Sequence, residues 1–107
     1  MGQSRLQLQT LLEQLMGSEP DEKLNVYFQP PANVQLKYPC IVYQRDAAST
    51  KFADNAPYNN KQRYQVTVID PEPDSDIPSK VAALPMSSFS RFFVADNLNH
   101  DVYNLYF

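Results

Sequence analysis

The clearest pattern in the chain is the alternation of apolar and polar residues over residues 62–69 (QRYQVTVI). In an extended backbone, successive side chains point to opposite sides, so the two sets separate onto two faces. The apolar set is Tyr64, Val66 and Val68, and the polar set is Arg63, Gln65 and Thr67. We predict a central strand with one apolar face.

Two shorter strands are predicted before it. Residues 24–28 (LNVYF) can extend until Pro30 and Pro31, which supply no backbone N–H for a ladder and must end the strand. A second apolar run covers residues 40–45 (CIVYQR), with Pro39 at its start. Both strands are expected to join the same sheet.

Two segments have helical spacing. Near the N-terminus, apolar residues recur every three or four positions, after a capping Ser4 and before Gly17: Leu8, Leu11, Leu12, Leu15 and Met16. A second, short helix begins near Pro78 and ends before Pro85, with Ile77, Val81 and Leu84 on one stripe. It spans barely two turns, so it depends on packing against the sheet.

The C-terminal part again alternates. In residues 89–94 (FSRFFV), Phe89, Arg91 and Phe93 are expected on one side, opposite Ser90, Phe92 and Val94. Turn residues 96–99 (DNLN) follow, and the chain ends in an apolar strand with Tyr103, Leu105 and Phe107 on one face. An end so apolar is expected to pair into the sheet or to pack against a neighbour.

The order of these elements predicts a single α+β domain over residues 1–107. We expect a mostly antiparallel sheet of about four to five strands, with two helices packed on one face. The polar segment 46–60 (DAASTKFADNAPYNN) has no clear periodicity, and we interpret it as an extended hairpin or loop arm.

Composition and charge exclude several classes of function. With two glycines in 107 residues, no glycine-rich phosphate-binding loop is present. The net charge of −3 and the dispersed basic residues argue against sequence-specific nucleic-acid binding.

The single Cys40 cannot form an internal disulfide and lies in an apolar run, which predicts a buried, inert thiol. No segment approaches the roughly 18 apolar residues of a membrane span, so we expect a protein made in the cytoplasm.

The acidic segment 70–76 (DPEPDSD) between the central strand and the second helix is the best candidate for a metal site. Carboxylates at alternate positions can wrap a calcium ion, but the glycine and the later bidentate glutamate of a calcium loop are missing. The alternative is a structural joint, in which Pro71 and Pro73 stop the strand and Asp74, Ser75 or Asp76 caps the helix. We favour the joint, and the metal-binding module or small metal-dependent enzyme remains the alternative.

No other residues suggest an enzyme. His100 is the only histidine, and its surroundings (NLNHD) match a surface turn rather than a nucleophile motif. A carboxylate pair drawn from Glu13, Glu19, Asp46 and Asp54 stays open, but no spacing recommends it. We therefore predict no catalytic residues, no cofactor and no metal.

The chain has more aromatic residues than one sheet face can bury. Contiguous exposed aromatic residues usually mark a partner surface. The candidate interface residues are Phe52, Tyr58, Phe92, Phe93, Tyr103, Tyr106 and Phe107. The opposing interpretation is that helices cover both faces of these strands, but only about two short helices are available.

Several runs resemble small tail-completion and tail terminator (neck) proteins of long-tailed bacteriophages and prophages. The resemblance covers most of the chain from about Tyr38 onward and is carried by packing and turn motifs: YPCIVYQRD (38–46), ADN (53–55), RYQVTVID (63–70), DIP (76–78) and DNLNHD (96–101). The resemblance implies an α+β fold with helices against a sheet and a protruding hairpin or loop.

The resemblance also implies a function. Such a protein would be a non-enzymatic virion component, assembled in the host cytoplasm, that closes the tail tube as a homo-oligomeric ring, with a hexamer expected. Its partners would be the major tail tube protein and the head-connector or stopper protein, and DNA would pass through the ring. A head-completion or stopper role in the same neck is the nearest alternative. A host-side adaptor that adds an edge strand to a partner is another.

Overall fold

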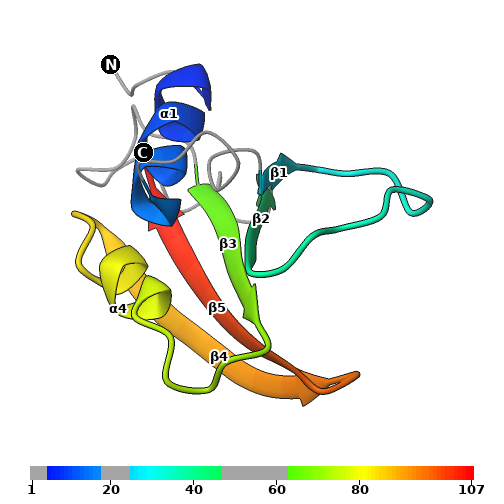
Figure 1. The fold of residues 1–107 in the computed structure, drawn as a ribbon. Coiled ribbons are helices and arrows are strands. Elements are labelled where there is room, and N and C mark those ends of the chain that lie inside the picture. The colour runs from blue at the N-terminus through cyan, green and yellow to red at the C-terminus, as the bar shows by residue number, and fades with distance from the viewer. Residues whose placement is uncertain (1–4, 18–24, 47–62) are drawn as a thin grey trace.

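The computed structural model describes residues 5–17, 25–46 and 63–107 of the chain. Two helices and five strands occur in these ranges (Figure 1): α1 (Arg5–Met16), β1 (Val26–Phe28), β2 (Cys40–Arg45), β3 (Arg63–Asp70), α4 (Ile77–Ala82), β4 (Ser87–Ala95) and β5 (Leu98–Tyr106). The predicted arm over residues 46–60 lies outside the described residues, apart from Asp46.

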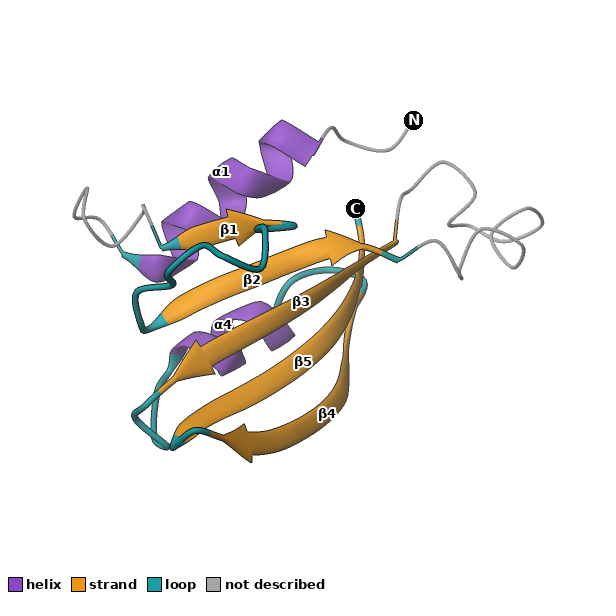
Figure 2. Cartoon of the chain, turned by 90° about the vertical axis from the view of Figure 1, so that its right-hand side faces the viewer, coloured by secondary structure: helices purple, strands orange, loops and turns teal. Residues whose placement is uncertain are grey.

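The five strands form one sheet in the order β1-β2-β3-β5-β4. β1 runs parallel to β2, and all other neighbouring pairs are antiparallel. Helices α1 and α4 lie on the same side of this sheet (Figure 2). The α+β class, the mostly antiparallel sheet and the two helices on one face are therefore confirmed, with β1 as a parallel edge strand.

The core lies between the helices and the face of the sheet that the alternation of β3 predicted to be apolar. Tyr64, Val66 and Val68 of β3 are buried there. They pack with residues of the other elements in one cluster that includes Leu8 and Leu12 of α1, Ile41 and Tyr43 of β2, Val81 of α4, and Tyr103 and Leu105 of β5. Burying this apolar surface is the main force that holds the short helices on the sheet.

Polar contacts fix α1 at one end of the sheet. Tyr43 Oη donates to Gln9 Oε1 at 2.5 Å, and Arg5 Nη1 donates to the same hydroxyl at 3.2 Å. The Arg5 guanidinium also stacks 4.5 Å from the ring centroid of Phe28. Because burial of Tyr43 outweighs the Arg5 contacts, the pKa of its hydroxyl is raised above the usual value and the phenol keeps its proton.

β4 and β5 form a hairpin whose turn is tighter than the sequence predicted. Residues 96–99 were expected to form the turn, but β5 already begins at Leu98. Asp96 and Asn97 are the two loop residues, with positive φ values of 54° and 62°. Two consecutive positive φ angles match the twist of a two-residue hairpin, and Asp and Asn tolerate them better than other non-glycine residues.

This turn yields a stability prediction. Replacing Asn97 with valine should lower the free energy of unfolding by about 1–2 kcal/mol, since a β-branched residue resists positive φ. Replacing Asn97 with glycine should change it by less than about 0.5 kcal/mol. Urea denaturation followed by circular dichroism measures both variants. Equal midpoints for the two variants would show that the turn is not constrained as described.

A β-bulge corrects the predicted faces of β4. Phe89 pairs with Tyr103 and Arg91 pairs with Val102, so Ser90 is an extra residue without its own partner on β5. The extra residue reverses the alternation after position 90. Phe89 consequently shares a face with Phe92 and Val94, and not with Arg91 and Phe93 as the plain alternation predicted.

Candidate interaction surface

The outer edge of β4 is open. Among the described strands, β4 pairs with β5 alone, so the backbone groups on its other side face away from the sheet. Every residue of β4 after Ser87 is exposed. A long exposed edge strand with apolar side chains is a template for pairing with another chain. By contrast, the opposite edge strand, β1, has three residues, and the carbonyl of its Val26 already accepts a hydrogen bond from Gln9.

Three apolar side chains on the helix-bearing face of β4 form what we call the β4 stripe: Phe89, Phe92 and Val94. Their exposed fractions are 58%, 52% and 60%. The ring of Phe89 makes an edge contact with the buried Tyr103, with centroids 5.6 Å apart. Phe92 lies beside Asp101 in the register of the hairpin, and burial raises the pKa of the Asp101 carboxyl despite the opposing effect of His100.

The opposite face of β4 carries a separate aromatic contact. The ring of Phe93 stacks on His100 with centroids 4.4 Å apart, and the Arg91 guanidinium lies 5.6 Å from the centroid of Phe93. His100 is half-buried in β5, with Nδ1 3.0 Å from the Leu98 carbonyl oxygen. The prediction of a surface turn histidine is therefore wrong, because the two-residue turn places His100 within the strand.

The candidate interface residues separate into distinct groups. Phe92 and Phe93 are exposed, on opposite faces of β4. Tyr106 and Phe107 are half-buried at the end of β5, and Phe52 and Tyr58 lie outside the described residues. The prediction that Tyr103 belongs to the interface is wrong, because its side chain is 5% exposed and lies in the core. It faces the helices because its register partner on β3 is the core residue Val66.

Sequence reasoning left two stripe residues, Phe89 and Val94, out of the candidate interface. Plain alternation placed Phe89 and Val94 on opposite faces of the strand. The bulge at Ser90 reverses the alternation after that residue, so both side chains lie on the same face. Ser90 lies between Phe89 and Arg91 in a run that contains other serines, so its residue type does not mark an irregularity. The sequence alone offers no way to distinguish it from an ordinary outward-facing residue.

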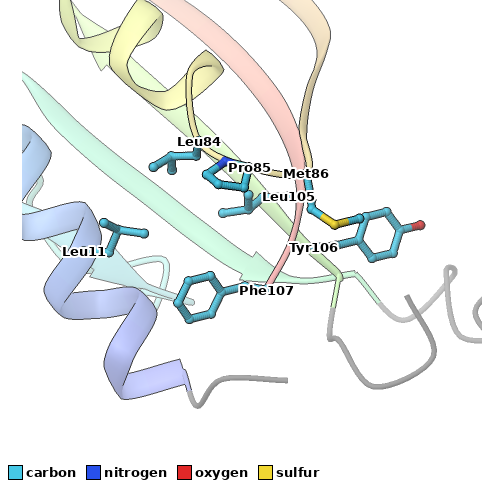
Figure 3. A pocket seen from close by; sticks show the side chains of 7 residues that line it. All are labelled: Leu11, Leu84, Pro85, Met86, Leu105, Tyr106 and Phe107. Atoms are coloured by element: carbon cyan, nitrogen blue, oxygen red, sulfur yellow. The ribbon is translucent and has the colours of Figure 1, made fainter. Parts of the chain in front are cut away.

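An apolar pocket of about 100 Å³ lies at the other end of the β4–β5 hairpin, beside the C-terminus (Figure 3). Leu11 of α1 and Phe107 lie on one side of it, and Met86 and Tyr106 on the other. Its remaining lining residues are Leu84, Pro85 and Leu105. Pro85 and Met86 are exposed at its rim, so the pocket can be reached from solvent.

The acidic segment 70–76 is a turn held by its own side chains. Asp70, which is buried, accepts a hydrogen bond at Oδ1 from the Glu72 backbone N–H at 2.7 Å. Glu72 Oε1 accepts one from the Asp74 N–H at 3.2 Å. Asn99 Nδ2 donates to the Asp70 carbonyl at 3.0 Å, which ties the turn to β5. These contacts are those expected of Asx-type turns.

A serine of the same segment accepts a hydrogen bond from the first residue of α4. Ser75 Oγ accepts a hydrogen bond from the Ile77 N–H at 3.3 Å, whereas the Asp76 side chain makes no capping hydrogen bond. Asp76 instead pairs with Lys80 at 3.7 Å on the surface. Of the three predicted caps, Ser75 is therefore the one that supplies the acceptor. In residues 5–17, 25–46 and 63–107, no group of three or more His, Cys, Asp or Glu side chains is arranged to hold a metal ion.

Cys40 is fully buried at the start of β2, and burial, with a smaller contribution from the Asp70 charge, raises the pKa of its thiol to about 12. At pH 8 this leaves about a thousandfold less thiolate than the usual pKa of 9.0 would give. We expect the native protein to resist thiol-specific reagents and the urea-unfolded protein to react fully, as measured by absorbance of the released chromophore. Rapid labelling of the native protein would contradict the burial.

None of the described helices is long and apolar enough to cross a membrane. Comparisons of the chain with models of protein families, with curated proteins and with solved structures find no match.

Proposed function

We propose that the chain is a structural virion protein that closes the end of a phage tail tube and docks it to the head connector as a homo-oligomeric ring. The single observation that carries this proposal is the open β4 edge with its exposed apolar stripe. A long apolar edge on a small domain favours a role in which another protein chain covers it.

The size of this surface supports an assembly role. Phe89 and Phe92 are each more than half exposed, and Val94 is 60% exposed. Since an aromatic side chain offers roughly 150–250 Å² for burial, the stripe supplies on the order of 300 Å². A stable interface buries about 800 Å² per partner, so the stripe is the apolar centre of a larger contact that includes the strand edge.

The resemblance to tail terminator proteins is the reason for proposing a ring at the end of a tail tube rather than another kind of assembly. Four of the runs that carry it form β2, β3, the start of α4 and the β4–β5 turn, which are the parts that shape the sheet and its hairpin, and the run ADN (53–55) lies outside the described residues. The net charge of −3 suits a ring through which DNA must pass, because weak contacts with phosphate allow movement. No residue is assigned a catalytic role.

The first test is the state of assembly. We expect light scattering to detect an oligomer whose mass rises with protein concentration, and electron microscopy of the concentrated protein to show rings. Alternatively, a monomer that forms rings only on isolated phage tail tubes would support the same function. A protein that stays monomeric at high concentration and ignores tail tubes would overturn it.

The second test separates the neck roles. A tail terminator should cap tail tubes from the phage that encodes it, whereas a stopper should bind DNA-filled heads and not free tubes. The position of the gene discriminates a neck protein from a host adaptor. A neck protein should be encoded between the portal or capsid genes and the major tail protein gene.

A further inference from the structure

The proposed ring requires that each subunit present two complementary surfaces. Resting on that proposed function, we propose that Phe92 of the β4 stripe inserts into the apolar pocket beside Met86 and Phe107 of the next copy of this chain, with Val94 packed at the pocket rim. The contact is heterologous, because the stripe and the pocket are different surfaces of the same subunit.

The two surfaces match in chemistry and size. The pocket has a volume of about 100 Å³ and is lined by aliphatic and aromatic side chains. It is of the same order as the ~150 Å³ apolar cavity that accommodates benzene, so one phenyl ring is a suitable occupant. Phe92 offers such a ring, 52% exposed, on the helix-bearing face. A buried aromatic anchor in an apolar pocket is the usual centre of a tight interface.

The stripe and the pocket cannot meet within one chain. Phe92 and Val94 lie near the turn of the β4–β5 hairpin, whereas Met86 precedes β4 and Phe107 follows β5 at the other end. In Figure 1 the hairpin turn and the C-terminus lie at opposite ends of the molecule. Only a second molecule can bring them together.

The charges at these two ends are complementary. The ends of β3 and β4, the start of β5 and the segment before α4 carry Asp70, Glu72, Asp74, Asp76, Asp96 and Asp101, of which Asp70 is buried and Asp76 is paired with Lys80. The end with the pocket carries three arginines: Arg5 at the start of α1, Arg45 at the end of β2, and Arg63, which is the register partner of the pocket residue Tyr106. Arg63 is paired with Asp46 at 3.2 Å, and Arg45 is exposed.

This distribution favours the heterologous contact over a two-fold pairing of β4 with β4. A head-to-tail contact brings an acidic end beside an arginine-bearing end and adds electrostatic attraction to the apolar contact. A two-fold pairing about the middle of β4 would bring the two Arg91 side chains together on one face, where like charges repel. A second copy docked head to tail is therefore the occupant that the surface fits.

Cysteine cross-linking tests the contact directly. One tagged batch carries Val94→Cys, which keeps the Phe92 ring, and an untagged batch carries Pro85→Cys, an exposed position at the pocket rim. Mixing the two batches under mild oxidation should give a covalent heterodimer with one subunit of each kind. The native Cys40 is fully buried and does not interfere. The matched control is Phe93→Cys, on the same strand but the other face, with which cross-linking to Pro85→Cys should be lost.

The outcomes separate this proposal from the proposed function. Homodimers from a further variant, Arg91→Cys, formed in place of the heterodimer, would replace the heterologous contact by a two-fold edge pairing. Equal cross-linking from positions 94 and 93 would also overturn the contact, even if the unmodified protein forms rings. Failure of the unmodified protein to assemble, alone or on tail tubes, would instead remove the ring itself. Circular dichroism of each cysteine variant confirms that it is folded before mixing.

Discussion

Phe92→Glu should abolish assembly of the protein into rings while leaving the subunit folded. Phe92 is exposed in the subunit, so the change should cost at most about 1 kcal/mol in folding, mainly because it places a second carboxylate beside Asp101. In the proposed head-to-tail contact, however, it removes an aromatic anchor and places a carboxylate in an apolar pocket. An anchor of this kind contributes at least about 2 kcal/mol, which is roughly a 30-fold weaker contact. Since each subunit of a ring makes two such contacts, we expect a monomer at concentrations where the unmodified protein assembles.

Light scattering over a concentration series measures this effect, and Phe93→Glu is the matched control. Both positions are exposed phenylalanines on β4, and they differ in the face on which they lie. We expect Phe93→Glu to assemble nearly as well as the unmodified protein, although it loses the stack on His100. If Phe93→Glu prevents assembly and Phe92→Glu does not, the wrong face of β4 has been assigned to the contact.

Much of the fold was predictable because local pattern and tertiary environment agree. The alternation around Val66 and Val68 predicted a strand with one apolar face, and the helices cover that face. The spacing of Leu8 and Leu12 likewise predicted the buried side of α1. In both cases the spacing of apolar residues within the element itself decides which side chains are buried, so the sequence of that element is enough to predict its buried face.

The features that were not predictable depend on pairing with distant residues. The bulge at Ser90 exists only in relation to the register of β5, and it decides that Phe89 and Phe92 share a face. The burial of Tyr103 depends on its placement opposite Val66 of β3. Likewise, the parallel direction of β1 follows from its pairing with β2, which no periodicity within residues 26–28 can specify.

The candidate surface was predictable in kind but not in detail. A surplus of aromatic residues over the available helices predicted that some would remain exposed, and Phe92 and Phe93 are exposed. The sequence could not show that they lie on an edge strand, since strand order is a property of the whole sheet. It also could not show the pocket, which combines α1, the segment before β4 and the C-terminus.

Leu12→Ala should lower the free energy of unfolding by about 3–5 kcal/mol, as measured by urea denaturation. Leu12 is fully buried in the core cluster, so the change loses apolar burial and leaves a cavity beneath α1. The control is Leu6→Ala on the same helix, where a side chain that is 64% exposed should cost less than about 0.5 kcal/mol.

The comparison also tests what positions the pocket. Leu11 of α1 forms one wall of it, so a loosened α1 should weaken assembly as well as folding. The polar contacts of Arg5 and Gln9 with Tyr43 remain in Leu12→Ala. If that variant were as stable as Leu6→Ala, those polar contacts rather than apolar packing would hold the helix on the sheet. Since burial of apolar surface is the dominant favourable contribution to folding and a hydrogen bond adds only about 1 kcal/mol, we expect apolar packing to dominate.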